Sequence, residues 1–361
     1  MKSGLLYIGN ENLHNELLSL INNNNELICF DISSGNKEKM IHIVLDNHLR
    51  ELCDESIFVQ ISLAVAYAEA YGCDRLYLPY DNKILNSESE NIIEYISKLK
   101  ELVRIGTMNK MELVFLLCSN VESVSRTKRE PIIVSDKYMV LFSGGIDCTV
   151  AAVMLKNQKK HVKLINFEYG QKNTKEETLC LSNTMKQFGF DCIKVNIKNF
   201  YDEIKFSSGL LNEIIQLSLE NKNLEYVPFR NTIFFAIALI YSKKYGIGNI
   251  TSGSQCDDMI SPDNSPEYYK ALRSFIKSSL KYSDIEIKSV LDEIGGKKEI
   301  IAYGTKQNVN FNYCWTCHCA GIYIDGEVYQ CGICSDCHTR YKAFKHLGLT
   351  DPIKYQVLPV I

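Results

Sequence analysis

The stretch that decides the fold is YMVLF at 138–142, followed by Ser143-Gly144-Gly145-Ile146-Asp147-Cys148-Thr149. An apolar strand here runs through two glycines into a helix. Glycines let the backbone turn tightly, so its N–H groups and the positive end of the helix can face an anion. The hydroxyls of Ser143 and Thr149 are expected to donate to phosphate oxygens. The GKS/T element of a Walker loop and the GxGxxG pattern are both missing. We therefore predict a nucleotide-phosphate loop of another type, formed by all seven residues.

Outward from this loop, short apolar runs alternate with helical patterns. After the strand at 138–142 we expect strands at 162–167, 192–195 and 249–252, with helices beginning at Asp147 and Asn173 and a longer one at 231–245. Strands interleaved with helices predict a doubly wound parallel α/β sheet. Residues 137–361 are expected to form this domain.

Residues 1–120 repeat the α/β pattern and predict an additional N-terminal domain. Expected strands are 5–8, 27–32, 41–45, 75–78 and 113–117, with helices at 57–71 and 90–103. The polar stretch 121–136 is interpreted as a linker. A shift of 174 positions places Ala64, Tyr67, Tyr71 and Gly72 on Ala238, Tyr241, Tyr245 and Gly246. Either this half is a degenerate copy without the phosphate loop, or the match reflects the common pattern of a helix ending at glycine before a strand.

Cysteines gather near the C-terminus. Of 14 in the chain, six lie between Cys314 and Cys337, whereas Cys29, Cys53, Cys73, Cys118, Cys180 and Cys192 stand singly in apolar or helical stretches. Such crowding in a reduced protein indicates metal binding. Four thiolates favour a structural zinc ion with no open position, although the spacing also permits an iron–sulfur cluster. The expected zinc knuckle spans 314–340, with ligands Cys317, Cys331, Cys334 and Cys337.

Composition excludes several classes of protein. Hydrophobic residues make up 46% and charged residues 23% of the chain, and the net charge is −3. This charge balance argues against a broad nucleic-acid surface. No apolar run reaches the roughly 18 residues of a membrane span, and the first residues do not resemble a signal peptide. The chain is expected to be cytoplasmic.

The loop resembles the SGGxDS signature of PP-loop ATP pyrophosphatases (adenine nucleotide alpha hydrolase-like proteins), with Cys148 replacing the usual serine. Four further motifs narrow the resemblance to QueC-like 7-cyano-7-deazaguanine synthases: FEYGQ at 167–171, VPFRN at 227–231 (VPGRN in the family), WTC at 315–317 and CGICSDC at 331–337. The resemblance covers about residues 136–355.

This resemblance implies an ATP-dependent carboxylate–amine ligase using ATP, Mg²⁺ and Zn²⁺. Such enzymes adenylate the carboxylate of 7-carboxy-7-deazaguanine, and ammonia then displaces AMP on the way to the nitrile. The implied catalytic residues are Ser143, Asp147, Arg230 and Lys297. Phe167, Tyr169 and Gln171 join the loop as nucleotide-binding residues, and Arg230, Asn231, Asp257 and Asp263 are the implied substrate-binding residues. A homodimer is implied by the family alone.

The amine that captures the adenylate is a separate question. Family members carry Cys-Arg where this chain has Asn264-Ser265, and about 130 residues precede the matched region. This extended form resembles QueC-like proteins found among bacterial antiviral defence genes, which implies conjugation of the deazaguanine to a protein amine. Synthesis of 7-cyano-7-deazaguanine with ammonia is the alternative. Two other classes remain open: a PP-loop tRNA-thiolation enzyme using Cys148 or Cys256, and an inactive nucleotide-binding module.

Overall fold

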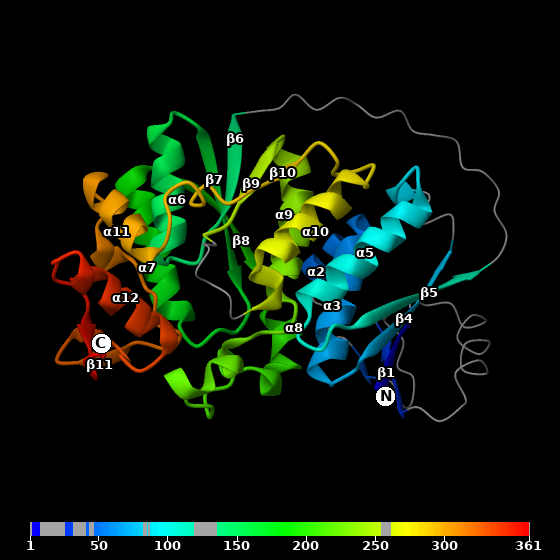
Figure 1. Ribbon diagram of the computed structural model, residues 1–361, viewed down its shortest axis with the longest axis horizontal. Helices are drawn as coiled ribbons and strands as arrows, with labels where there is room; N and C mark the ends of the chain where they lie inside the picture. The colour runs from blue at the N-terminus through cyan, green and yellow to red at the C-terminus, as the bar shows by residue number, and fades with distance from the viewer. Residues whose placement is uncertain are drawn as a thin grey trace. The chain divides into compact units, whose positions relative to one another are not determined.

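The computed structural model describes residues 2–7, 26–31, 41–42, 47–81, 85, 87–118, 136–253 and 261–360. Of the expected linker 121–136, only Asp136 is among them. The chain forms two compact units (Figure 1). The catalytic unit holds residues 134–227, 241–261 and 286–361, and the N-terminal unit holds residues 1–133, 228–240 and 262–285. These units are not consecutive stretches, unlike the expected boundaries, and the packing of α10 described below gives the reason.

The catalytic unit is built on a five-stranded sheet in the order β10-β9-β6-β7-β8, in which every pairing is parallel. This confirms the doubly wound α/β fold. Its strands are β6 (Lys137–Leu141), β7 (His161–Glu168), β8 (Asp191–Asn196), β9 (Asn249–Thr251) and β10 (Glu286–Ile287); its helices are α6 (Ile146–Asn157), α7 (Thr174–Phe188), α8 (Lys198–Asp202), α11 (Lys297–Lys306) and α12 (Ser335–His346), with short 3₁₀ turns η1 (Lys205–Ser207), η2 (Leu219–Glu225) and η4 (Phe311–Tyr313).

The central strand β6 is covered on both faces, as its continuous apolar run requires. Tyr138 and Val140 belong to the core cluster that includes much of α6 and part of α11. Met139 points the other way, and its Sδ lies 3.7 Å from the Ser242 hydroxyl at the end of α9 (Arg230–Tyr245). The carboxyl end of β6 is thus fixed in the middle of the unit, where the phosphate loop begins.

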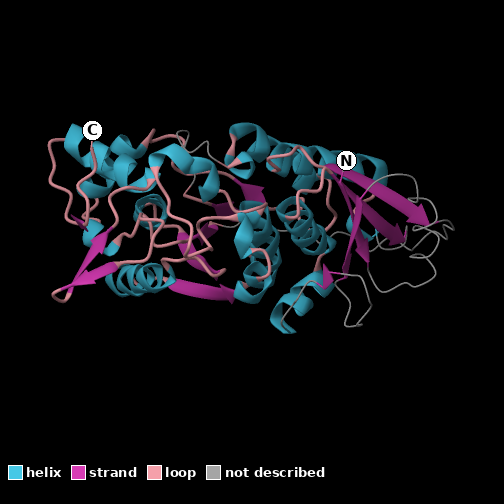
Figure 2. Cartoon of the chain, turned by 90° about the horizontal axis from the view of Figure 1, so that it is seen from below, coloured by secondary structure: helices cyan, strands magenta, loops and turns pink. Residues whose placement is uncertain are grey.

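A small second sheet follows the catalytic sheet along the chain. It contains β11 (Ile322–Ile324), β12 (Glu327–Gln330) and β13 (Lys354–Tyr355), in that order. Figure 2 shows this hairpin apart from the parallel strands. These short strands were not predicted from the sequence. They bring the chain back on itself between Cys317 and Cys331, which carry two of the expected metal ligands.

The N-terminal unit has its own parallel sheet in the order β3-β2-β1-β4-β5. Its strands are β1 (Lys2–Tyr7), β2 (Glu26–Asp31), β3 (Ile41–His42), β4 (Arg75–Asp81) and β5 (Glu112–Cys118); its helices are α2 (Asn47–Glu55), α3 (Ile57–Ala70), α5 (Ile92–Gly106) and α10 (Pro266–Lys277), with the turn η3 (Pro262–Asn264) and the first part of α9. The expected α/β pattern of residues 1–120 is therefore present, and α2 is an addition to it.

Helix α10 joins this unit because its apolar face is buried against α5. The Phe275 ring lies 4.7 Å from that of Phe58 and 4.9 Å from that of Tyr95. Tyr268, Leu272 and Phe275 are all at most 1% exposed. Contiguous aromatic burial of this kind is strongly stabilising, so sequence order does not decide the unit to which α10 belongs.

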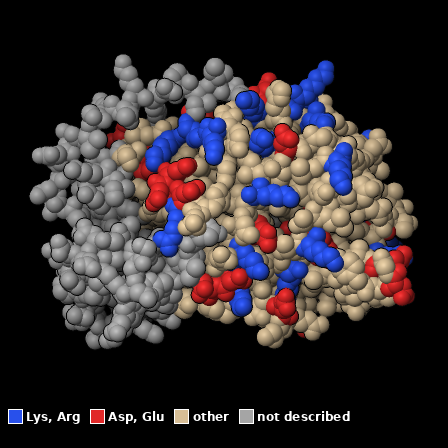
Figure 3. Space-filling view, turned by 180° about the vertical axis from the view of Figure 1, so that it is seen from behind, with Lys and Arg blue, Asp and Glu red and all other residues tan. Residues whose placement is uncertain are grey.

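The surface charge agrees with the charge balance of the sequence, which argues against a broad nucleic-acid surface. On the face drawn in Figure 3, basic and acidic side chains are interspersed. Within the described residues, no helix has the length and apolar character to cross a membrane. Cys53, Cys73 and Cys180 are buried and Cys192 is half-buried, consistent with a small apolar role.

Candidate active site and metal centre

The phosphate loop has the geometry that its glycines predict. Gly144 has φ of +86°, and a Cβ there would lie 3.0 Å from the Glu177 carbonyl oxygen and 3.1 Å from Cys180 Cβ. Gly145 is extended (φ −76°, ψ 175°), and α6 begins at the next residue. The first N–H groups of α6 thus follow a turn that only glycine fits at position 144.

An ion pair lies at the start of α6. Lys297 Nζ donates to Asp147 Oδ2, and Lys297, the first residue of α11, is only 8% exposed. Burial raises the pKa of Asp147, and the Lys297 ammonium opposes this rise. Asp147 Oδ1 is buried and has no hydrogen-bond partner. The structure therefore brings two predicted catalytic residues together and leaves one carboxylate oxygen available to a cation.

Two loop side chains make hydrogen bonds within the loop and the first turn of α6. The Thr149 hydroxyl is buried and donates to the Gly145 carbonyl at 2.7 Å, and its contact with a phosphate stays a prediction. Cys148 Sγ lies 3.6 Å from Ser143 Oγ and 3.4 Å from the Gly145 carbonyl oxygen. Burial raises the pKa of the Cys148 thiol, which favours the unreactive protonated form.

Sequence reasoning missed Gly253, which lies just past β9. A Cβ at this position would be 2.8 Å from the Cys148 backbone nitrogen and 3.2 Å from Asp147 Cβ. The end of β9 thus approaches the start of α6 closely, on the side of the sheet where strand order reverses. The Ser252-Gly253 pair after a strand was the available signal, but only the fold shows what the glycine contacts.

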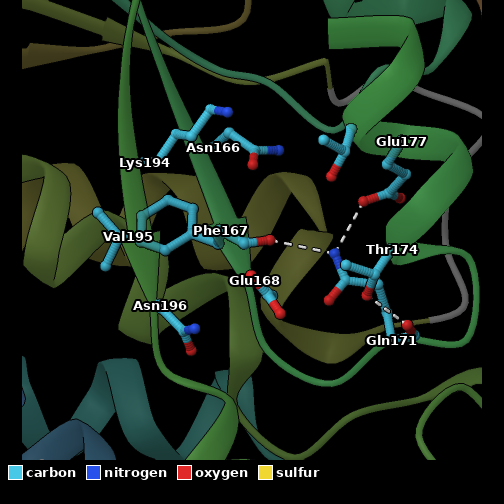
Figure 4. A pocket seen from close by; sticks show the side chains of 10 residues that line it. Asn166, Phe167, Glu168, Gln171, Thr174, Glu177, Lys194, Val195 and Asn196 are labelled. Carbon is cyan, nitrogen blue, oxygen red and sulfur yellow. Dashed lines mark hydrogen bonds between the residues drawn. The ribbon is translucent and has the colours of Figure 1, made fainter. Parts of the chain in front are cut away.

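The FEYGQ segment forms a tight turn organised by Gln171. Its amide nitrogen donates to the Phe167 carbonyl at 3.1 Å and to Glu177 at 2.8 Å (Figure 4). Its amide oxygen accepts from the Tyr169 N–H at 2.9 Å. The Tyr169 ring packs edge-on against Tyr201 at 5.7 Å. Phe167, Tyr169 and Gln171, predicted to bind the nucleotide, are all buried and hold the turn in shape.

A pocket of about 150 Å³ lies beside this turn, at the carboxyl ends of β7 and β8. In parallel α/β sheets this edge is where ligands bind. Phe167 and Gln171 line the pocket, and polar side chains that sequence reasoning did not single out complete it: Asn166, Glu168, Thr174, Glu177, Thr178, Lys194 and Asn196. Their placement depends on the pairing of β7 with β8, which no local pattern reveals.

Arg230, Asn231 and Asp263 belong to the N-terminal unit and form a cluster of their own. Asp263 is 1% exposed; its Oδ2 accepts from the N–H of Asn231 at 2.8 Å and of Thr232 at 3.4 Å. The carboxylate therefore caps α9, whereas Ser265 caps α10 by accepting from the Tyr268 N–H. The substrate-binding roles of these residues stay predictions, and Asp257 lies outside the described residues.

We expect Asp263 to make stability depend on pH. Burial raises its pKa to about 6, against the opposing pull of Arg230. The folded state then holds the proton more tightly than the unfolded state, so the free energy of unfolding falls as pH rises from about 4 to about 7, by up to about 3 kcal/mol. Asp263→Asn should flatten this slope in urea titrations, whereas Glu267→Gln, which changes an exposed acid on α10, should leave it unchanged. Identical slopes for wild type and Asp263→Asn would contradict the assignment.

The four predicted metal ligands meet. The Sγ atoms of Cys317, Cys331, Cys334 and Cys337 lie within 4.8 Å of one another, and all four residues are buried. Backbone N–H groups of Cys319 and Cys331 point at Cys317 Sγ at 3.3 and 3.4 Å, and those of Ile333 and Cys334 point at Cys331 Sγ at 3.4 Å each. Such donors stabilise thiolates, so these residues fit a four-thiolate zinc ion.

Neighbours of this centre connect it to the phosphate loop. The Trp315 N–H donates to the Gly144 carbonyl at 2.9 Å, and Asn173 donates to the Cys317 carbonyl at 2.8 Å. His318 lies between carboxylates, with Nε2 3.1 Å from Asp336 and Nδ1 3.5 Å from buried Glu225. The four-cysteine group is thus linked to the phosphate loop by hydrogen bonds of the 315–317 segment.

Arg340 also holds the segment that leads into Trp315. It is fully buried and paired with Asp351 at 2.9 Å, and it donates to the carbonyls of Cys314 at 2.6 Å and Phe311 at 3.1 Å. A buried guanidinium with partners on all sides fixes the segment that leads into Trp315. Its partners lie 11 to 29 positions away in the sequence and were not predictable from a local pattern.

Comparison with known proteins shows the family of the chain. The family model described as "Queuosine biosynthesis protein QueC" matches residues 137–348. The 7-cyano-7-deazaguanine synthase of Thermoplasma volcanium is 30% identical over 235 residues, which are 62% of this chain and 92% of that protein. The synthase of Nautilia profundicola is 30% identical over 232 residues, 61% of this chain and 98% of that protein.

A solved structure from Methanocaldococcus jannaschii, described as a predicted subunit of tRNA methyltransferase, is 19% identical and covers 61% of this chain and 91% of its own. Its TM-score of 0.33 is too low to support an argument. The sequence relatives therefore carry the comparison.

Proposed function

Because the chain belongs to the QueC family, we propose that it is an ATP-dependent ligase that activates the carboxylate of 7-carboxy-7-deazaguanine as an acyl-adenylate. The observation that carries the proposal is the buried Asp147–Lys297 pair at the start of α6, directly after the glycine turn. Backbone N–H groups, a helix N-terminus and a buried ammonium all favour an anion at this place.

Carboxylates react poorly with amines because the leaving group is poor. In the proposed first step a carboxylate oxygen bonds to the α-phosphorus of ATP, and the bond to the bridging oxygen breaks with release of pyrophosphate. An amine nitrogen then bonds to the acyl carbon and loses a proton, and AMP leaves. Lys297 and the loop N–H groups would neutralise charge on the departing pyrophosphate. Asp147 Oδ1, buried without a partner, would hold Mg²⁺, a cation that prefers carboxylate and phosphate oxygens.

We further propose that the amine belongs to a protein, in a bacterial antiviral defence setting. Alignments to the curated relatives span nearly all of those proteins but only 61–62% of this chain. The family model begins at residue 137, so a large N-terminal part is additional. Asn264 and Ser265, which replace Cys-Arg of the family, also have structural roles: Asn264 accepts from the Tyr269 hydroxyl at 3.0 Å and Ser265 caps α10. In this proposal, the added N-terminal part and the two changed residues affect how the amine acceptor is bound.

The test is pyrophosphate release from ATP with and without 7-carboxy-7-deazaguanine, followed by mass spectrometry of small molecules and intact proteins. Carboxylate-dependent release supports the adenylating ligase, and its absence contradicts it. Full conversion to the nitrile with ammonia would identify 7-cyano-7-deazaguanine synthesis as the activity and overturn the protein acceptor. An acyl adduct on a protein amine would support it.

The thiolation alternative gains no support from the described residues. Cys148 is buried, and its raised pKa opposes the thiolate that sulfur transfer needs. Cys256 lies outside the described residues.

A further inference from the structure

We propose that the N-terminal segment is a second, non-catalytic copy of the catalytic fold. Its helix α5 covers the face of α10 through which two separate copies of this fold would otherwise pair. The chain then carries its own partner and works as a monomer. The proposal is independent of the reaction proposed above.

The two sheets have one topology. In each, the first strand lies at the centre, the second and third follow on one side, and the fourth and fifth lie on the other, with all pairings parallel. The order β3-β2-β1-β4-β5 therefore matches β8-β7-β6-β9-β10. A doubly wound order is common, so topology by itself does not establish a repeat; the residue-level register does.

A constant shift of 174 residues aligns the second half of both sheets. Arg75 pairs with Glu112 where β4 meets β5, and Asn249 pairs with Glu286 where β9 meets β10. The Glu112 N–H donates to the Asp74 carbonyl at 2.9 Å, and its counterpart, the Glu286 N–H, donates to the Gly248 carbonyl at 2.9 Å. Strand starts and crossover hydrogen bonds thus coincide without a gap.

Helix ends obey the same shift. Asn91 caps α5 by accepting from the Glu94 N–H at 3.2 Å, and Ser265 caps α10 by accepting from the Tyr268 N–H at 3.2 Å. The helices before β4 and β9 end alike as well. The rings of Tyr67 and Tyr71 stack at 6.4 Å, as do those of Tyr241 and Tyr245. The next residue is in each case a glycine with positive φ, Gly72 or Gly246. The Cys73 N–H donates to the Ala68 carbonyl at 2.8 Å, and its counterpart, the Ile247 N–H, donates to the Ser242 carbonyl at 2.8 Å.

A shift of 135 aligns the first two strands. Lys2 pairs with Glu26, and Lys137 pairs with His161, so the same 24 positions separate the paired residues in both sheets. At this shift Ile8-Gly9-Asn10-Glu11-Asn12 stand where Ser143–Asp147 stand. The copy has therefore lost the serine, one glycine and the aspartate of the phosphate loop, which explains why only one half is catalytic.

Because the shift maps α5 onto α10, the packing of these two helices is a helix meeting its own counterpart. This is the contact that a two-fold pair of identical folds makes. Here the contact is specialised: Glu88, 1% exposed, pairs with Lys281 at 2.7 Å, and Ser89 donates to the Ser278 carbonyl at 2.7 Å. The Glu88 carboxylate is buried whereas the Lys281 side chain is 38% exposed, so separating the two would leave a buried charge without its partner.

Phe229 shows that the catalytic motif itself has adapted to this contact. It has φ of +49°, a conformation that favours glycine, and the resembling VPGRN motif has glycine there. Its ring is fully buried and lies where a Cβ on Gly106 of α5 would meet it at 2.8 Å. Contact with α5 therefore compensates for a strained phenylalanine.

The test uses the full chain with a protease recognition sequence introduced between residues 120 and 132. Sedimentation of the uncut protein should give the mass of one chain, 41.2 kDa, from low to high micromolar concentration. After cutting, the two fragments should remain together on gel filtration. A stable homodimer of the uncut chain, or separation of the fragments, would overturn the proposal.

A variant pair then locates the contact. Phe275→Asp on α10 should lose co-elution of the cut fragments, because the new charge would be buried against Phe58 and Tyr95. Arg273→Asp, an exposed position on the same helix, should keep it. Co-elution that survives Phe275→Asp would mean that other contacts hold the copy.

Discussion

Lys297→Met should lower carboxylate-dependent pyrophosphate release by about 100- to 1000-fold, the range seen when one preorganised charge-stabilising donor is removed. Lys297 is buried at the start of α11 and donates to Asp147 next to the glycine turn. Methionine keeps an unbranched, largely apolar side chain and removes the ammonium, with its charge and its hydrogen-bond donors. The loss should fall on kcat more than on KM, because in the proposed reaction the ammonium acts on charge that develops as pyrophosphate leaves.

Lys298→Met is the matched control. It makes the same chemical change one residue along, at an exposed position, and should leave the rate within about twofold, since an exposed charge is screened by water. Thermal unfolding of both variants separates lost catalysis from lost folding. A Lys297→Met enzyme with unchanged kcat would remove Lys297 from the reaction and leave it a structural partner of Asp147.

Features that depend on neighbours in sequence were predictable. The phosphate loop needs Gly144 and Gly145 between a strand and a helix, and the metal centre needs closely spaced cysteines, so short windows contain the signal. The loop was expected at 143–149, and α6 begins at Ile146. Cys331, Cys334 and Cys337 meet Cys317 as expected.

Features that depend on contacts between residues distant in the sequence were not predictable. The capping of α9 by Asp263, whose carboxylate accepts from the Asn231 N–H, depends on α9 lying beside a residue 32 positions further along the chain. The close approach of Gly253 to Cys148 and Asp147 cannot be inferred from the Ser252-Gly253 pair that follows the strand. The hydrogen bond from the Thr149 hydroxyl to the Gly145 carbonyl likewise depends on how the first turn of α6 is formed.

The repeat was visible in the sequence only as four residues at the end of a helix, a pattern many unrelated helices share. What distinguishes a true repeat is the matched set of backbone hydrogen bonds, such as those of Glu112 and Glu286. Backbone partners leave little trace in side-chain identity, because many residue types can occupy a paired strand position. The low sequence similarity of the two halves is therefore compatible with one fold.

Removing the metal should disable the phosphate loop as well as the knuckle. Cys334→Ser, or exhaustive chelation, is expected to lower the free energy of unfolding by well over the roughly 1 kcal/mol of a typical substitution, and to weaken ATP binding at least tenfold. The reason is the chain of contacts from the thiolates through the 315–317 segment: the Trp315 N–H holds the Gly144 carbonyl, and the Cys317 carbonyl holds Asn173. Calorimetric ATP binding and thermal unfolding measure the two effects separately.

Cys319→Ser tests whether the ligand set is right. Cys319 is a half-buried neighbour whose N–H points at Cys317 Sγ, but its own thiol lies outside the four-sulfur group. This variant should retain one zinc per chain by elemental analysis and bind ATP like the wild type, whereas Cys334→Ser should lose the metal. Equal loss in both variants would place Cys319 among the ligands. A visible absorption band that disappears on reduction or chelation would identify an iron–sulfur cluster instead, since zinc has a filled d shell and is colourless at these wavelengths. If the metal is zinc and the protein still binds ATP after the zinc has been removed by chelation, Arg340 holds the 314–317 segment without the ion. Arg340 is anchored independently of the metal, to Cys314 and Asp351.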